Sequence, residues 1–145
     1  MDFPEYITTD EVKRVCDQIG IRDWTQLTEP AVELREAKII RDLIGSEALD
    51  VSIEAFKQGL EVELEHGVQY PDANVTNNHP LLTGKIVLAH LKEMLDYYLR
   101  LDVAELEGDM LKALVSGDEA KLAGKFRKLV EARAKLNAQE QAQLP

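Results

Sequence analysis

The chain has very little cysteine, few aromatic residues and no long apolar run. Its 145 residues include one cysteine, Cys16, so an internal disulfide is excluded and a reducing, cytoplasmic location is expected. No apolar stretch approaches the ~20 residues that a membrane-spanning helix needs. The first residues lack the basic and apolar regions of a signal peptide. We therefore expect an intracellular domain with no membrane association.

Positive charge is also scarce. The chain has 17 Lys and Arg residues against 27 Asp and Glu residues, which gives a formal net charge of -10. The excess of acidic residues is unevenly distributed. Residues 1–116 hold 11 basic and 23 acidic side chains, whereas residues 117–145 hold 6 basic and 4 acidic side chains. Such a body repels phosphates, so direct binding of nucleic acid through it is disfavoured. A cation or a basic protein partner is compatible with this charge.

Alternating strand patterns are nearly absent, while helical periodicity and capping signals recur. The sequence predicts an all-α fold, a compact bundle of five or six helices with a longer C-terminal helix. The expected ranges are about 9–19, 29–44, 53–66, 80–101 and 118–138, with a restart or kink near Asp102. We expect residues 1–116 to form one helical domain. Residues 117–145 are expected to form a charged helix with a frayed tail, and the chain is expected to self-associate through this helix.

Local signals place the ends of these helices. Thr8 predicts the first start, and Thr28 with Pro30 predicts the second. Gly67 is expected to end the third helix in a left-handed conformation. Ser116 has the form of a capping residue for the last helix. The connector between the first two helices carries Ile21, Trp24 and Leu27, which we expect to fill the core, and His79 is expected to start the helix that follows it.

A carboxylate and histidine pair lies on each of two neighbouring predicted helices. Glu63 and His66 share one stripe at i, i+3 spacing with Phe56 and Gly59, and His90 and Glu93 share another with Ile86 and Tyr97. Gly59 in mid-helix costs ~1 kcal/mol relative to alanine, which close approach of a second helix would explain. His90 and Glu93 are expected to face protein. Di-metal helical bundles use this spacing.

Three interpretations of the four residues fit the sequence. Two imidazoles with two carboxylates suit zinc, iron or manganese, with Glu61, Glu65, Asp96 and Tyr97 as outer-shell partners. Alternatively, Glu63 with His90 and His66 with Glu93 form interhelical hydrogen bonds that fix the register. General acid–base catalysis is the third. The choice depends on whether the two helices stand at matching heights.

Two segments resemble a known family. They are residues 59–67 (GLEVELEHG) and residues 74–101, which contain NVTN, LLTGKI, LAHLKE and DYY. Over about residues 50–102 the chain resembles the domain of unknown function 5661 family. The resemblance implies no activity. It implies that the residues characteristic of the family include Glu63, His66, His90, Glu93, Asp96 and Tyr97. The chain departs from the family pattern at Leu95, where proline is usual, at Leu99, where threonine is usual, and at His79, where an acidic residue is common.

Together these features predict a small acidic helical binding module that holds a divalent metal through Glu63, His66, His90 and Glu93. The alternative is a metal-free acidic adaptor that acts through protein–protein contact, in phage or host regulation, with a basic partner. No separate catalytic base or substrate-pocket signature is present, so an enzyme is the less favoured class. No catalytic residue and no organic cofactor is assigned.

Overall fold

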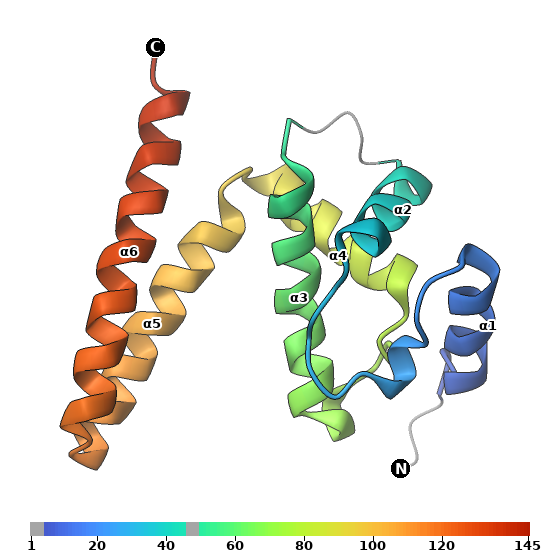
Figure 1. Cartoon of the computed structure of the whole chain (residues 1–145), viewed down its shortest axis with the longest axis horizontal. Coiled ribbons are helices and arrows are strands. Elements are labelled where there is room, and N and C mark those ends of the chain that lie inside the picture. The colour runs from blue at the N-terminus through green and yellow to red at the C-terminus, as the bar shows by residue number, and fades with distance from the viewer. Residues whose placement is uncertain (1–4, 46–49) are drawn as a thin grey trace. The chain divides into compact units, whose positions relative to one another are not determined.

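The computed structural model describes residues 5–45 and 50–145, and within them the chain is helical without strands. The described residues form six α-helices (Figure 1): α1 (Thr9–Ile19), α2 (Leu34–Ile44), α3 (Ile53–Gln69), α4 (Pro80–Glu93), α5 (Tyr97–Ser116) and α6 (Glu119–Gln143). Two short 3₁₀ turns, η1 (Trp24–Gln26) and η2 (Pro71–Ala73), lie in the connectors. The predicted all-α class and the long C-terminal helix are confirmed. No helix of the described part is long and apolar enough to cross a membrane.

The chain divides into two compact units, Met1–Leu95 and Asp96–Pro145. Unit 1 contains α1 to α4, and unit 2 contains α5 and α6. Our sequence-based boundary lay at residues 116 and 117. The structure divides the chain about twenty residues earlier, because α5 packs on α6 as an antiparallel hairpin (Figure 1).

The core of unit 1 collects one apolar face from each of its helices. α1 contributes Val12, Val15 and Cys16, which lie at helical spacing and are all buried. Trp24 in η1 is completely buried, which confirms its expected place in the core, whereas Ile21 and Leu27 are half-buried. The other fully or almost fully buried apolar side chains come from α2, α3 and α4: Ala37, Ile40, Phe56, Leu60, Leu64, Val87 and Leu91.

Three helix starts follow the local capping chemistry. The Thr8 hydroxyl accepts the Glu11 N–H at 3.2 Å, and the Ser52 hydroxyl accepts the Ala55 N–H at 3.1 Å. Pro80 is the first residue of α4, where a missing N–H costs nothing.

The buried His79 precedes Pro80, and the Nδ1 atom of His79 accepts the Leu82 N–H at 3.4 Å. Burial lowers the pKa of His79, which favours the neutral ring that this bond requires.

The expected start of α2 was wrong. The helix begins at Leu34, with Glu33 as its N-cap, and Thr28 and Pro30 lie in an irregular connector. The carboxylate of Glu36 accepts the Glu33 N–H at 3.0 Å, which provides the cap. Side chains from distant parts of unit 1, Arg22 and Glu61, hold the connector away from helical geometry.

The expected end of α3 was also wrong. Gly67 does not terminate this helix, which continues to Gln69. A Cβ atom on Gly67 would lie 2.2 Å from Asn78 Oδ1 and 2.8 Å from Asn74 Nδ2. The glycine is therefore required by side-chain packing against the loop that follows α3. The same loop places Asn77 and Asn78 at positive φ, 47° and 61°.

The single helix expected over 80–101 is two helices. α4 ends at Glu93, Met94 is extended (φ -159°), and α5 begins at Tyr97. No glycine or proline marks this break. The buried Asp96 precedes α5 and accepts two hydrogen bonds from the Arg100 guanidinium, at 2.9 and 2.7 Å. This side-chain pairing stabilises a new helix start where periodicity alone predicts continuation.

Unit 2 is a helical hairpin. Gly117 ends α5 with a positive φ of 71°, and the Asp118 carboxylate caps α6 by accepting the Lys121 N–H at 2.9 Å. Ser116, the expected cap, instead donates its hydroxyl to the carbonyl of Ala113. Leu106, Leu129 and Ala132 form the buried core of the hairpin. α6 continues to Gln143, so the tail expected to fray after residue 138 is helical.

Candidate functional site

Two of the four predicted ligands meet. Glu63 Oε1 on α3 lies 3.0 Å from His90 Nδ1 on α4. The Glu63 side chain is 16% exposed and that of His90 is 30% exposed, so the contact is partly shielded from water. α3 and α4 therefore stand at matching heights at this pair, which sequence could not decide.

The other two predicted ligands are not part of this contact. His66 is exposed one turn beyond Glu63, and Glu93 is exposed at the last residue of α4. The expectation that Glu93 faces protein was therefore wrong, because the helix ends there and the expected stripe does not continue to Tyr97. In the part of the chain that the structure describes, no three His, Cys, Asp or Glu side chains converge as a metal site would require.

The expected outer-shell carboxylates on α3 have other partners. Glu61 Oε1 accepts hydrogen bonds from Lys57 Nζ at 2.5 Å and from the Val32 N–H at 3.0 Å. Glu65 is exposed and accepts a hydrogen bond from Gln69.

The remaining two outer-shell candidates belong to unit 2. The Arg100 guanidinium beside Asp96 holds the pKa of that carboxyl below its usual range, although burial opposes the shift. Tyr97 packs edge to face on Tyr98, with ring centroids 5.2 Å apart.

An open cleft of about 280 Å³ adjoins the Glu63–His90 pair. Glu63 and His66 line it from α3, and Ile86 lines it from α4. The loop after α3 supplies further groups, among them the amide of Asn74 and the hydroxyl of Thr76. The remaining lining residues are Gly67, Tyr70, Ala73 and Val75. The cleft is thus lined by a glutamate, a histidine, an asparagine and a threonine together with apolar residues.

A network of asparagine side chains builds the loop that lines this cleft. Asn74 Nδ2 donates to Asn78 Oδ1 at 2.8 Å and to the carbonyl of Gly67 at 3.3 Å. Asn78 Nδ2 donates to the carbonyl of the buried Trp24 at 3.4 Å. The NVTNN segment is therefore a framework that joins the end of α3 to the core. The family resemblance includes its NVTN motif, but no sequence pattern indicates the partners of its amides.

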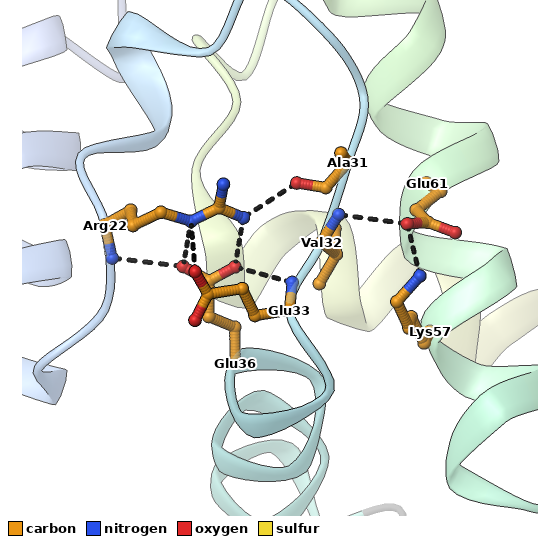
Figure 2. A network of polar contacts seen from close by, with 7 residues as sticks. All are labelled: Arg22, Ala31, Val32, Glu33, Glu36, Lys57 and Glu61. Atoms are coloured by element: carbon orange, nitrogen blue, oxygen red, sulfur yellow. Dashed lines mark hydrogen bonds and ion pairs between the residues drawn. The ribbon is translucent and has the colours of Figure 1, made fainter.

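A second polar network went unpredicted and lies around the N-terminus of α2. The Glu36 carboxylate accepts three hydrogen bonds from Arg22 (Figure 2). The donors are the backbone N–H of Arg22 at 3.1 Å, its Nε at 3.0 Å and its Nη2 at 2.6 Å. Glu36 is 1% exposed. Burial would raise the pKa of its carboxyl, but the bonds from Arg22 and from the backbone outweigh burial and lower it.

The same network fixes the connector before α2. Arg22 Nη2 also donates to the carbonyl of Ala31 at 2.7 Å, and Glu61 on α3 accepts the N–H of Val32 from the other side (Figure 2). The connector is thus bonded to partners 9 and 29 residues away in the chain. These contacts explain why the segment is not helical. The only local signal was the Glu33-x-x-Glu36 spacing at the true helix start.

A family model described as a protein of unknown function (DUF5661) matches residues 12–107. The match covers the resemblance seen at 50–102 and extends it through α1 and α2. No curated protein and no solved structure matches the chain significantly.

Proposed function

Because the chain belongs to the DUF5661 family, whose description assigns no activity, we propose a function from its own site. The protein is a small, non-catalytic binding module that holds a divalent cation where α3 meets α4. The observation that carries this proposal is the contact of Glu63 and His90 beside the open cleft.

The spacing of these two groups suits a shared ion. Two cis ligands that each lie about 2.1 Å from a metal are about 3.0–3.4 Å apart, for bond angles from 90° to 109°. The Glu63 oxygen and the His90 nitrogen are 3.0 Å apart. A carboxylate oxygen with an imidazole nitrogen is a ligand pair for zinc, iron(II) or manganese.

His66 is the third ligand in this proposal. It follows Glu63 by one helical turn and lines the same cleft. Its exposed ring has room to turn toward the Glu63 carboxylate, and the cleft has room for the water molecules that would complete the coordination. Glu93 lies one turn beyond His90 and is the fourth candidate, at the cost of a larger side-chain rearrangement.

Metal uptake tests this proposal directly. Protein purified without a tag or chelator is analysed by plasma mass spectrometry, and the emptied protein is titrated with zinc or manganese by calorimetry. We expect about one ion per chain in the wild type. His90→Gln and Glu63→Gln retain hydrogen-bonding groups but remove metal ligands, so both variants lose the ion and keep most of their stability.

The matched control is Glu65→Gln, which removes an exposed carboxylate from the same helix and leaves uptake unchanged. A wild-type chain that takes up no added metal refutes the proposal. The Glu63–His90 contact would then be an interhelical hydrogen bond that fixes α3 against α4.

The acidic adaptor is a second candidate, supported by the charge of unit 1. Residues 1–95 hold 18 acidic and 9 basic side chains, so a basic protein partner is favoured. Pull-down with the immobilised chain should recover such a partner, and raising the salt concentration should weaken its binding steeply. Binding that is insensitive to salt contradicts this function.

A further inference from the structure

The α5–α6 hairpin carries large apolar side chains outside its own small core. That core contains Leu106, Leu129 and Ala132, with Val103 and Met110 packed against it. Five other apolar side chains of the hairpin are more than half exposed: Leu111 61%, Leu114 63%, Val115 81%, Phe126 52% and Val130 53%. Single exposed apolar residues are ordinary, but a group on two neighbouring helices indicates an interaction surface.

An ion pair shows that these residues share one side of the hairpin. On α5, Glu107 precedes Leu111 and Leu114 at i, i+4 and i+7, and on α6, Phe126 and Val130 precede Arg133 at the same spacing. Glu107 and Arg133 form an ion pair at 2.6 Å across the two helices. Each helix stripe therefore contains one partner of this bridge, so both stripes lie on the side that it spans. We call this surface, made by Leu111, Leu114, Phe126 and Val130, the apolar hairpin face.

The ion pair between Lys125 and Asp109, at 2.5 Å, fixes the relative height of the two helices. Leu111 lies two residues from Asp109 toward the turn, and Phe126 lies one residue from Lys125 away from it. At 1.5 Å per residue they stand within about one helical turn of each other. The apolar residues of α5 and α6 thus form one continuous patch rather than two separate ones.

The two helices that carry this face have opposite charge. α5 holds four acidic and two basic side chains, whereas α6 holds six basic and three acidic side chains. A partner that covers the face must therefore complement an acidic helix and a basic helix at once. Unit 1, with 18 acidic and 9 basic side chains, complements only α6.

We propose that a second copy of the same hairpin covers the apolar hairpin face. A two-fold axis that lies in the interface, parallel to the helices, places α5 of each protomer against α6 of its partner, so acidic helices meet basic helices twice. The result is a four-helix bundle with the apolar residues inside. Helical stability in proteins comes mainly from packing, and this arrangement gives a two-helix unit a second packed face.

The mass of the full chain in solution tests the proposal. Light scattering after size exclusion, over a range of concentrations, should give twice the 16.3 kDa of one chain. Leu114→Glu and Phe126→Glu place charges in the centre of the face. Each should weaken self-association at least about thirtyfold, the effect expected for loss of a central interface residue.

The matched control is Leu43→Glu on α2, because Leu43 is 57% exposed and lies outside the hairpin. It should leave the dimer intact. Leu114→Gln, an uncharged change to a residue that favours helices, should also weaken the dimer, and circular dichroism should show that every variant keeps its helix content.

Two results would overturn the proposal. One is a wild-type chain that stays monomeric at high micromolar concentration, which would leave the face to unit 1 or to another protein. The other is a dimer that the face variants leave unchanged, which would place the interface elsewhere. Metal uptake by the variants is measured in parallel and is expected to persist, so the two proposals fail independently.

Discussion

Replacement of Gly67 by alanine should destabilise unit 1, although alanine is the better helix former. Gly67 lies inside α3, where glycine costs ~1 kcal/mol relative to alanine. The added Cβ would stand 2.2 Å from Asn78 Oδ1 and 2.8 Å from Asn74 Nδ2, closer than side-chain carbons approach such atoms. Both amides must therefore move.

The size of the effect follows from the bonds that this movement breaks. Displacement of the two amides disrupts three hydrogen bonds, from Asn74 to Asn78, from Asn74 to the Gly67 carbonyl and from Asn78 to the Trp24 carbonyl. At about 1 kcal/mol each they contribute about 3 kcal/mol. The gain in helix propensity offsets about 1 kcal/mol. The expected net loss in the free energy of unfolding is about 2 kcal/mol.

Urea denaturation followed by the fluorescence of Trp24, the only tryptophan of the chain, measures this loss. The same change is then made together with Asn78→Gly, which removes the clashing amide and tolerates the positive φ of 61°. In that background Gly67→Ala should cost much less. Gly108→Ala, with no atom within 4 Å of its added Cβ, should stabilise α5 by up to about 1 kcal/mol. An equal cost of Gly67→Ala in both Asn78 backgrounds would refute the packing argument.

Three further outcomes are expected in unit 1. Gly84→Ala should cost about 1–3 kcal/mol in urea denaturation, because its Cβ would lie 2.6 Å from Ile40 Cγ2 and force α4 away from α2. Glu36→Gln should cost about 2 kcal/mol in the same assay, because the almost fully buried carboxylate accepts charge-assisted hydrogen bonds from Arg22. The folded-state pKa of Glu36 is below its ordinary 4.5, so its contribution is present above about pH 4.5 and is lost as the pH falls through the folded value. Denaturation between pH 3 and 6 should therefore show a shallower pH dependence in Glu36→Gln than in the wild type, and equal slopes would contradict this role.

Sequence predicted the parts of the fold that local chemistry determines. The helix starts at Thr9, Ile53 and Pro80 were anticipated because their signals are local. Thr8 and Ser52 accept N–H groups of the first turn, and Pro80 stands where an N–H group is not needed. The start of α2 was misplaced because Arg22 and Glu61 hold the connector from 9 and 29 residues away. No local pattern contains such contacts.

The candidate site was predictable to the same extent. Helical periodicity placed Glu63 and His90 on stripes, and the structure brings these two within 3.0 Å. Helical periodicity could not reveal that α4 ends at Glu93. The break depends on the pairing of Asp96 with Arg100 and not on a glycine or proline. The stripe that linked His90 to Tyr97 therefore crosses a helix boundary, which periodicity treats as continuous.

The asparagine loop also has a consequence for the order in which unit 1 is assembled. The Asn77 side chain donates to the carbonyl of Ile7 at 2.6 Å and to the Glu5 carboxylate at 2.7 Å, across 70 and 72 residues of chain. Contacts so distant in sequence carry a large loop-closure entropy and form late in folding. On the ribosome, Glu5 and Ile7 must wait until residue 77 has emerged before they find this partner. Glu5 and Ile7 are synthesised before Asn77 but are therefore among the last described residues of unit 1 to become fixed.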